Sequence, residues 1–126
     1  MAQRPYNRAD RLAKSIQEVV SDSLQYEASD PRLNAVVVTR VVVAPDLQNC
    51  KVYWNLLTPG DAAELAEVDA ALTRARGWLK RQIAGQVHVR KLPDIKLYHD
   101  RGLEHARHME ELLRDLPGTS TGERSE

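Results

Sequence analysis

The sequence is poor in the patterns that mark covalent cross-links and membrane segments. Cys50 is the only cysteine among 126 residues, which excludes a disulfide within the chain. A lone cysteine is typical of a reducing compartment and most often serves as a small buried apolar residue. No apolar run approaches the roughly 20 residues that cross a membrane, and the first ten residues lack the apolar stretch of a signal peptide. We therefore expect a cytoplasmic protein that does not enter a membrane.

Motifs for phosphate binding and for catalysis are missing as well. The chain has no glycine-rich loop of the Walker or dinucleotide-binding type, and no Ser/His/Asp or Cys/His arrangement stands out. A group of titratable side chains near the C-terminus could be mistaken for metal ligands; these are His99, Asp100, Glu104, His105 and His108. Zinc requires three or four well-oriented ligands, and no known ligand pattern supports a site here. We expect no metal, no cofactor and no catalytic residue; a small metal-dependent enzyme is the alternative that these histidines leave open.

The charged residues are segregated along the chain, although the formal net charge is zero. Residues 61–71 contain four acidic side chains and no basic one, whereas residues 72–101 contain eight basic and two acidic side chains. Residues 1–14 are also basic. A basic segment of this kind favours a surface that binds a polyanion, and internal pairing with the flanking acids is the simpler alternative.

The spacing of apolar residues predicts the first half of a small α+β domain. Helical spacing predicts a first helix from Arg8 to about Tyr26, with Asn7 as its N-cap. The β-branched residues of 35–43 and the alternation of 50–57 predict two strands. Their short connection makes them an antiparallel hairpin.

The second half of the chain predicts two more helices and one strand. Asp61 and Glu64 have the spacing of a capping box at the start of a helix that reaches about Gly85. A strand at 94–100, an amphipathic helix at 103–116 and a polar tail at 117–126, which we expect to be disordered, complete the chain. We expect one domain at 7–116, after an N-terminal extension of residues 1–6, with helices on one face of a three-stranded sheet. Its core should include Leu12, Ile16, Val52, Trp54, Leu72 and Leu79.

A glycine interrupts the second helix where its basic part begins. Gly77 costs roughly 0.5–1 kcal/mol relative to alanine in a helix interior. On a helical wheel Arg74 and Arg81 lie with it, opposite the apolar stripe, whereas Arg76 lies beside that stripe. A bend at Gly77 would turn Arg76 outward and leave room for a ligand to approach; a merely tolerated surface glycine is the alternative. Trp78 lies off the stripe, and its role stays open.

Several stretches, in this order, resemble the ribosome-binding factor A family of bacterial small-subunit assembly factors. They are DPRL after the first helix, APDLQNCKVYWNLL through the hairpin, ARG at the bend, then VRKLPDIKLYHD and LEHARHMEELL. The resemblance covers about Asn7 to Leu116. It implies a KH-like fold of type II in which an Ala-x-Gly kink, here Ala75-Arg76-Gly77, replaces the GxxG loop. No GxxG occurs in this chain.

The resemblance also implies a non-enzymatic function. Such a factor binds 16S rRNA on the immature 30S subunit, assists late 16S rRNA processing and leaves the finished particle. The candidate RNA-binding side chains are the cations near the bend and at the N-terminus: Arg74, Arg76, Lys80, Arg81, Arg90, Lys91, Arg4, Arg8 and Arg11. We expect a monomer whose partners are the 30S subunit and 16S rRNA. The main alternative is a general KH-like RNA-binding module without ribosome specificity. Whether the two groups of cations join depends on how the first helix packs against the bent one.

Overall fold

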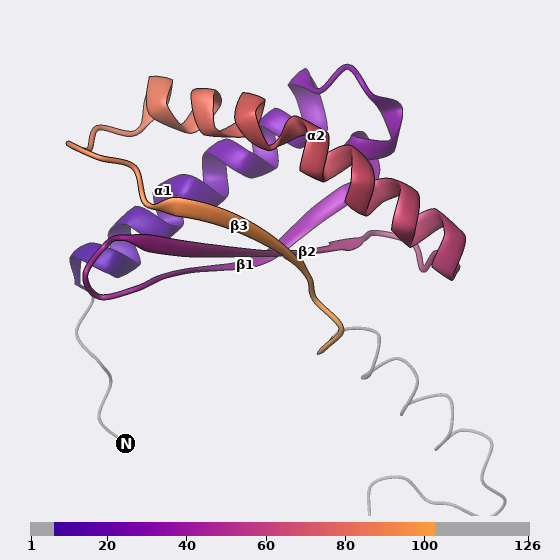
Figure 1. The fold of residues 1–126 in the computed structure, drawn as a ribbon, viewed down its shortest axis with the longest axis horizontal. Helices are drawn as coiled ribbons and strands as arrows, with labels where there is room; N and C mark the ends of the chain where they lie inside the picture. The colour runs from indigo at the N-terminus through magenta and orange to yellow at the C-terminus, as the bar shows by residue number, and fades with distance from the viewer. Residues whose placement is uncertain (1–6, 103–126) are drawn as a thin grey trace, which may run out of the picture.

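The computed structural model describes residues 7–102 and shows helices stacked on one face of a sheet (Figure 1). The elements in chain order are α1 (Arg8–Asp22), η1 (Ser23–Glu27), η2 (Pro31–Ala35), β1 (Val36–Val43), β2 (Asn49–Leu56), α2 (Ala62–Gln86) and β3 (Asp94–His99). The predicted α+β arrangement is confirmed for these residues. The predicted helix at 103–116, the tail and the N-terminal extension lie outside the described residues, so the limits of the domain stay predictions.

The first helix begins and ends where its sequence predicts. The Asn7 side chain accepts a hydrogen bond from the Asp10 backbone N–H at 3.0 Å, and Asp10 accepts one from the Asn7 N–H at 3.2 Å, which is a capping box. The last turn widens into the π-helical segment η1. Beyond it, the Asp30 side chain caps η2, and Pro31 occupies the first position of that segment.

The three strands form a sheet in the order β1-β2-β3. β1 and β2 are antiparallel, as predicted for a hairpin, and β2 and β3 are parallel across the α2 connection. The register between β1 and β2 shifts at Thr39, where Val38 pairs with Trp54 but Arg40 pairs with Tyr53. This bulge places Val41 and Val43 on the same face as Val38, because one extra residue reverses the alternation along the strand.

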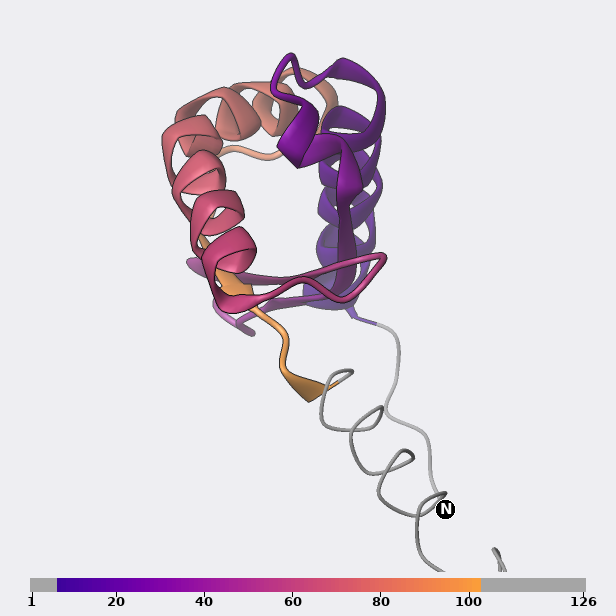
Figure 2. The ribbon, with the colours of Figure 1, turned by 90° about the vertical axis from the view of Figure 1, so that its right-hand side faces the viewer.

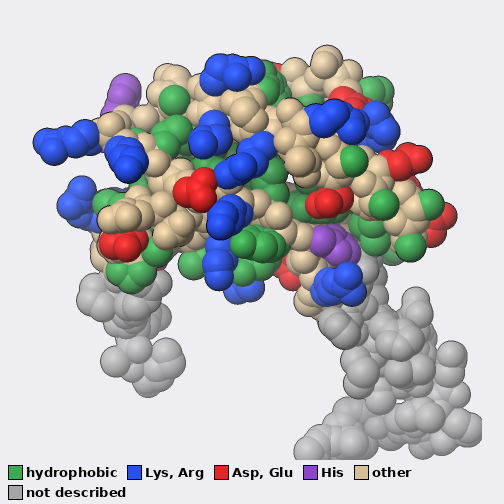
Figure 3. All heavy atoms as spheres, viewed as in Figure 1, with side chains coloured by type: hydrophobic (Ala, Val, Ile, Leu, Met, Phe, Trp, Pro, Cys, Tyr) green, Lys and Arg blue, Asp and Glu red, His purple; other side chains and the backbone are tan. Residues whose placement is uncertain are grey.

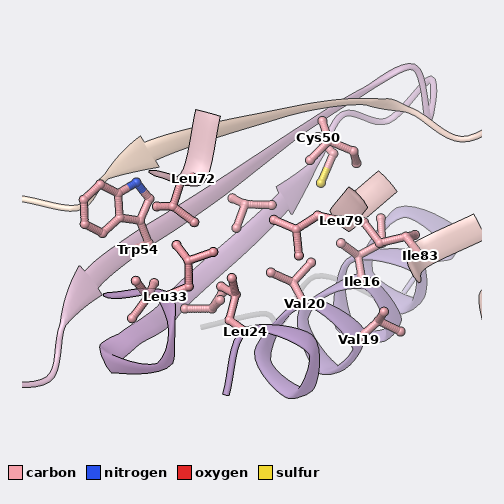
Figure 4. Packing of buried hydrophobic residues seen from close by; sticks show 14 of the residues in the cluster. Ile16, Val19, Val20, Leu24, Leu33, Cys50, Trp54, Leu72, Leu79 and Ile83 are labelled. Atoms are coloured by element: carbon pink, nitrogen blue, oxygen red, sulfur yellow. The ribbon is translucent and has the colours of Figure 1, made fainter. Parts of the chain in front are cut away.

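The core lies between the sheet and the two helices (Figure 4). All six predicted core residues, Leu12, Ile16, Val52, Trp54, Leu72 and Leu79, are buried, with at most 8% of each exposed. Cys50 is buried beside them, and burial raises the pKa of its thiol to about 12. The predicted role of Cys50 as a small apolar residue is confirmed, because a protonated buried thiol is neither a nucleophile nor a metal ligand.

The axis of α2 bends in the middle third of the helix, as Figures 1 and 2 show from two sides. The backbone stays helical from Ala62 to Gln86. Val68 and Leu72 in the first half and Leu79 and Ile83 in the second are all buried in the one core. That Gly77 is the cause of this bend stays a prediction.

Candidate nucleic-acid interface

The outer side of α2 presents two arginines around a position without a side chain. Arg74, Gly77 and Arg81 are exposed, as the helical wheel predicts. A Cβ built on Gly77 would meet only the Arg81 Nη1 atom, at 3.7 Å, so the space above this glycine is open. Because no side chain covers the helix at this position, the sugar-phosphate backbone of a nucleic acid can approach it closely between the two guanidinium groups. We call Arg74, Gly77 and Arg81 the outer ridge.

Arg76 points toward the sheet. Its Nε donates to the Ile95 carbonyl at 2.7 Å, and its Nη2 lies 2.9 Å from Asp94 Oδ1. The expectation that the bend turns Arg76 outward is wrong. Among the described residues β3 is an edge strand, whose outer carbonyls are free to accept from a neighbouring helix. Arg76 therefore joins α2 to β3, although 40% of its side chain remains exposed.

The remaining predicted residues near the bend are divided between the core side and the surface. Ala75 is half-buried and packs against the core, and its role in a kink stays a prediction. Lys80 is half-buried, whereas Arg90 and Lys91 are exposed in the loop between α2 and β3. This loop extends the positive charge of the outer ridge toward the sheet.

The N-terminal cations meet the far end of α2. Arg8 and Arg11 are exposed on the first turns of α1. They line a hollow of about 380 Å³ together with residues 86–89, the segment that leads to Arg90 and Lys91. The structure thus places Arg8 and Arg11 beside the end of α2 and the segment that precedes Arg90; Arg4 lies outside the described residues. We call Arg8, Arg11, Arg90 and Lys91 the terminal cluster.

Positive and negative charge are unevenly distributed over the face shown in Figure 3. Lysine and arginine side chains cover the C-terminal half of α2 and the adjoining sheet, and acidic side chains gather over its N-terminal half. The acids of this half are Asp61, Glu64, Glu67 and Asp69. Within residues 7–102, no ion pair joins them to the basic segment 72–101. For the acids of residues 61–71, the simpler alternative of internal pairing finds no support there, whereas the acids of residues 103–126 lie outside the described residues.

The polar groups near the end of β3 have structural partners. The His99 ring lies 4.9 Å from the Trp54 ring, and its Nε2 is 3.2 Å from Asn55 Oδ1. Asp100 accepts from the Thr39 hydroxyl at 2.5 Å, and this hydrogen bond lowers the pKa of Asp100. Among the described residues, no three His, Cys, Asp or Glu side chains are placed to hold a metal, and no helix is long and apolar enough to span a bilayer. The remaining predicted cluster members, Glu104, His105 and His108, lie outside the described residues.

The family model of ribosome-binding factor A matches residues 8–113 of this chain. The chain belongs to the ribosome-binding factor A family. A ribosome-binding factor A from Desulfitobacterium hafniense is 38% identical over 110 residues, which cover 87% of this chain and 86% of that protein.

A crystal structure and a fitted homology model share the KH-like fold of the family. The crystal structure of ribosome-binding factor A from Thermus thermophilus matches with a TM-score of 0.63 at 23% identity, over 75% of this chain and 97% of that one. The Thermus thermophilus homology model fitted into the cryo-EM map of a 30S–RbfA complex matches with a TM-score of 0.59 at 24% identity, over 75% and 96%. At these identities the two structures support the fold of this family member.

Sequence reasoning missed two features of this surface. The first is the partner of Arg76, which the position of that residue beside the apolar stripe could have suggested. The second is the setting of Trp78, which lines a hollow of about 290 Å³ with Arg74 and the η1–η2 segment. With its amide oriented to satisfy both neighbours, Gln82 accepts from the Trp78 indole N–H and donates to Glu27, each at 3.2 Å. The indole is therefore fixed behind the outer ridge.

Proposed function

We propose that this member of the ribosome-binding factor A family is a non-enzymatic assembly factor of the cytoplasm. It binds 16S rRNA on the immature 30S subunit, assists late 16S rRNA processing and leaves the finished particle. The observation that carries the proposal is the polarised surface of the bent helix, with its acidic first half and basic second half. Family membership supplies the particle, because relatives carry the name of ribosome-binding factors.

Binding is electrostatic in this proposal. Phosphates bind the outer ridge and the terminal cluster and release counterions, so affinity falls steeply with salt. Gly77 lets the RNA backbone approach α2 closely. Arg76 acts chiefly as a positioning residue, since it holds the basic half of α2 against β3. Lys80 adds a further positive charge to the same half of the helix.

Sedimentation with purified small subunits tests the proposal. Arg74→Gln with Arg81→Gln removes two positive charges from exposed positions, so we expect the protein to leave the 30S fraction of a sucrose gradient at a salt concentration where wild type remains. Ala62→Glu with Ala63→Glu is the matched control, because it changes the net charge by the same amount at exposed positions at the start of α2, away from Arg74. The free energy of unfolding of both variants should lie within about 1 kcal/mol of the wild-type value.

The outcomes separate this function from its alternative. If the control leaves the 30S fraction as readily as the arginine variant, net charge rather than the outer ridge governs binding, and the proposed site is wrong. A wild-type protein that spreads with any added RNA instead of following the 30S subunit would be a general RNA-binding module.

A further inference from the structure

The face of the sheet that points away from the helices carries a row of aromatic and basic side chains. In the parallel register of β2 and β3, Lys51 pairs with Lys96 and Tyr53 pairs with Tyr98. Arg40 of β1 pairs with Tyr53 from the other side. Alternation along the strands puts these side chains on the face opposite the core. We call Arg40, Lys51, Tyr53, Lys96 and Tyr98 the sheet-face cluster.

The three planar side chains of the cluster lie in a row. The guanidinium carbon of Arg40 lies 4.2 Å from the centroid of the Tyr53 ring. The Tyr53 and Tyr98 ring centroids are 5.7 Å apart, with 31° between the ring planes. Tyr98 is 41% exposed, and β3 is the edge strand among the described residues. A further planar group can therefore stack on the exposed Tyr98 ring, and the exposed guanidinium of Arg40 offers a second plane at the other end of the row.

The charge of this face favours an anionic occupant. Arg40, Lys51 and Lys96 are exposed cations. Alternation places Asp94 on the same face, but its carboxylate already receives Arg76 at 2.9 Å and lies 3.9 Å from Lys96. Figure 3 shows lysine and arginine side chains continuing from α2 across β3 to the lower edge of the molecule, next to hydrophobic side chains. The sheet-face cluster is therefore continuous with the basic surface of the bent helix.

We propose that the sheet-face cluster binds a single-stranded segment of RNA. Unpaired bases stack on Tyr98 and Arg40, and Lys51 and Lys96 bind the adjoining phosphates. A duplex does not fit this chemistry, because its base faces are already stacked on one another. The inference rests on the proposed function only for the class of partner, and it assigns a surface separate from the outer ridge.

The binding of a labelled single-stranded RNA octamer, followed by fluorescence anisotropy at several salt concentrations, tests the inference on the full chain. Tyr98→Thr keeps a strand-forming residue and removes the ring. We expect its Kd to rise at least about fivefold with an unchanged salt slope, since stacking involves no counterion. Tyr98→Phe should restore the wild-type Kd, and Val42→Thr on the same face is the control that should change nothing.

The charged part of the cluster has a different signature. Lys51→Gln with Lys96→Gln should lower the slope of log affinity against log salt by roughly 0.7 for each phosphate that the variant no longer binds. If Tyr98→Thr fails to fold, as a thermal melt would reveal, Tyr98→Val carries the same test, because valine also favours a strand and lacks the ring. The Kd for a blunt-ended RNA duplex should be the same for Tyr98→Thr as for wild type.

Three results would overturn the inference. The first is a Tyr98→Thr protein that binds the octamer as tightly as wild type. The second is equal losses for single strand and duplex. The third is a photo-cross-linking residue in place of Tyr98 that joins a ribosomal protein, and no RNA, in the 30S complex, which would make this face a protein-binding surface. If any of these results were found, the proposed function would still stand as long as the Arg74→Gln, Arg81→Gln variant lost its binding to the 30S subunit.

Discussion

Arg76 offers a quantitative test of how the bent helix is held against the sheet. Arg76→Ala removes the charged donor of the 2.7 Å bond to the Ile95 carbonyl and one partner of the Asp94 ion pair. A hydrogen bond to a charged group contributes about 1.5–3 kcal/mol net, and an exposed ion pair contributes only about 0–1 kcal/mol. Because 40% of the Arg76 side chain is exposed, we discount the sum and expect a loss of about 1–2 kcal/mol.

Urea unfolding measures this loss. With a slope of roughly 2 kcal/mol per molar urea, the middle of the range for a small domain, the midpoint should fall by about 0.5–1 M. Arg81→Ala is the matched control, since it deletes the same side chain from an exposed position on the same helix and should stay within about 0.5 kcal/mol. Asp94→Asn should cost less than Arg76→Ala because it leaves the bond to the Ile95 carbonyl in place. The reasoning is refuted if Arg76→Ala unfolds at the same urea concentration as Arg81→Ala.

Three further perturbations have defined outcomes. Gly77→Ala should raise the free energy of unfolding by roughly 0.5–1 kcal/mol, because alanine favours the helix and its Cβ has room. The same variant should bind 30S subunits more weakly in sedimentation. Unchanged binding would show that no RNA backbone approaches α2 at this position. Cys50, with a pKa of about 12, should react with a thiol reagent at pH 8 only as fast as the protein opens, and a rate equal to that of a free thiol would contradict its burial. The lowered pKa of Asp100 gives stability that is present above the pKa of the unfolded carboxyl and is lost as pH falls through the folded value, below about pH 4. Thr39→Val, which removes the first cause of that lowered pKa, should weaken this acid dependence in urea titrations at pH 7 and pH 3, and an unchanged difference would count against the hydrogen bond.

Most of the fold could be predicted because its signals are local. The apolar spacing of α1, the short turn before β2 and the cap at Asp61 each depend on residues within a few positions of one another. Cys50 and Trp54 share one strand face with other apolar residues, so their burial follows from the alternation alone. The segregation of charge between the two halves of α2 is likewise a property of the sequence.

The candidate site was predictable only where a residue's direction follows from its own helix. Arg74 and Arg81 lie outside because the wheel puts them opposite the apolar stripe. Arg76 lies beside that stripe, and its direction was decided by a carbonyl 19 residues further along the chain. No local pattern shows that this acceptor lies within reach.

Long-range pairing decided the rest of the surface. The sequence by itself determined the order of α1, the hairpin, α2 and β3, the burial of the six predicted core residues and the position of the basic segment. The tertiary structure decided that Thr39 is the extra residue of a bulge, that Arg8 and Arg11 meet the end of α2, and that Tyr53 lies beside Tyr98. The physical reason is that periodicity fixes which side of an element a residue occupies, whereas the register between β2 and β3 depends on how the whole α2 connection packs across the sheet.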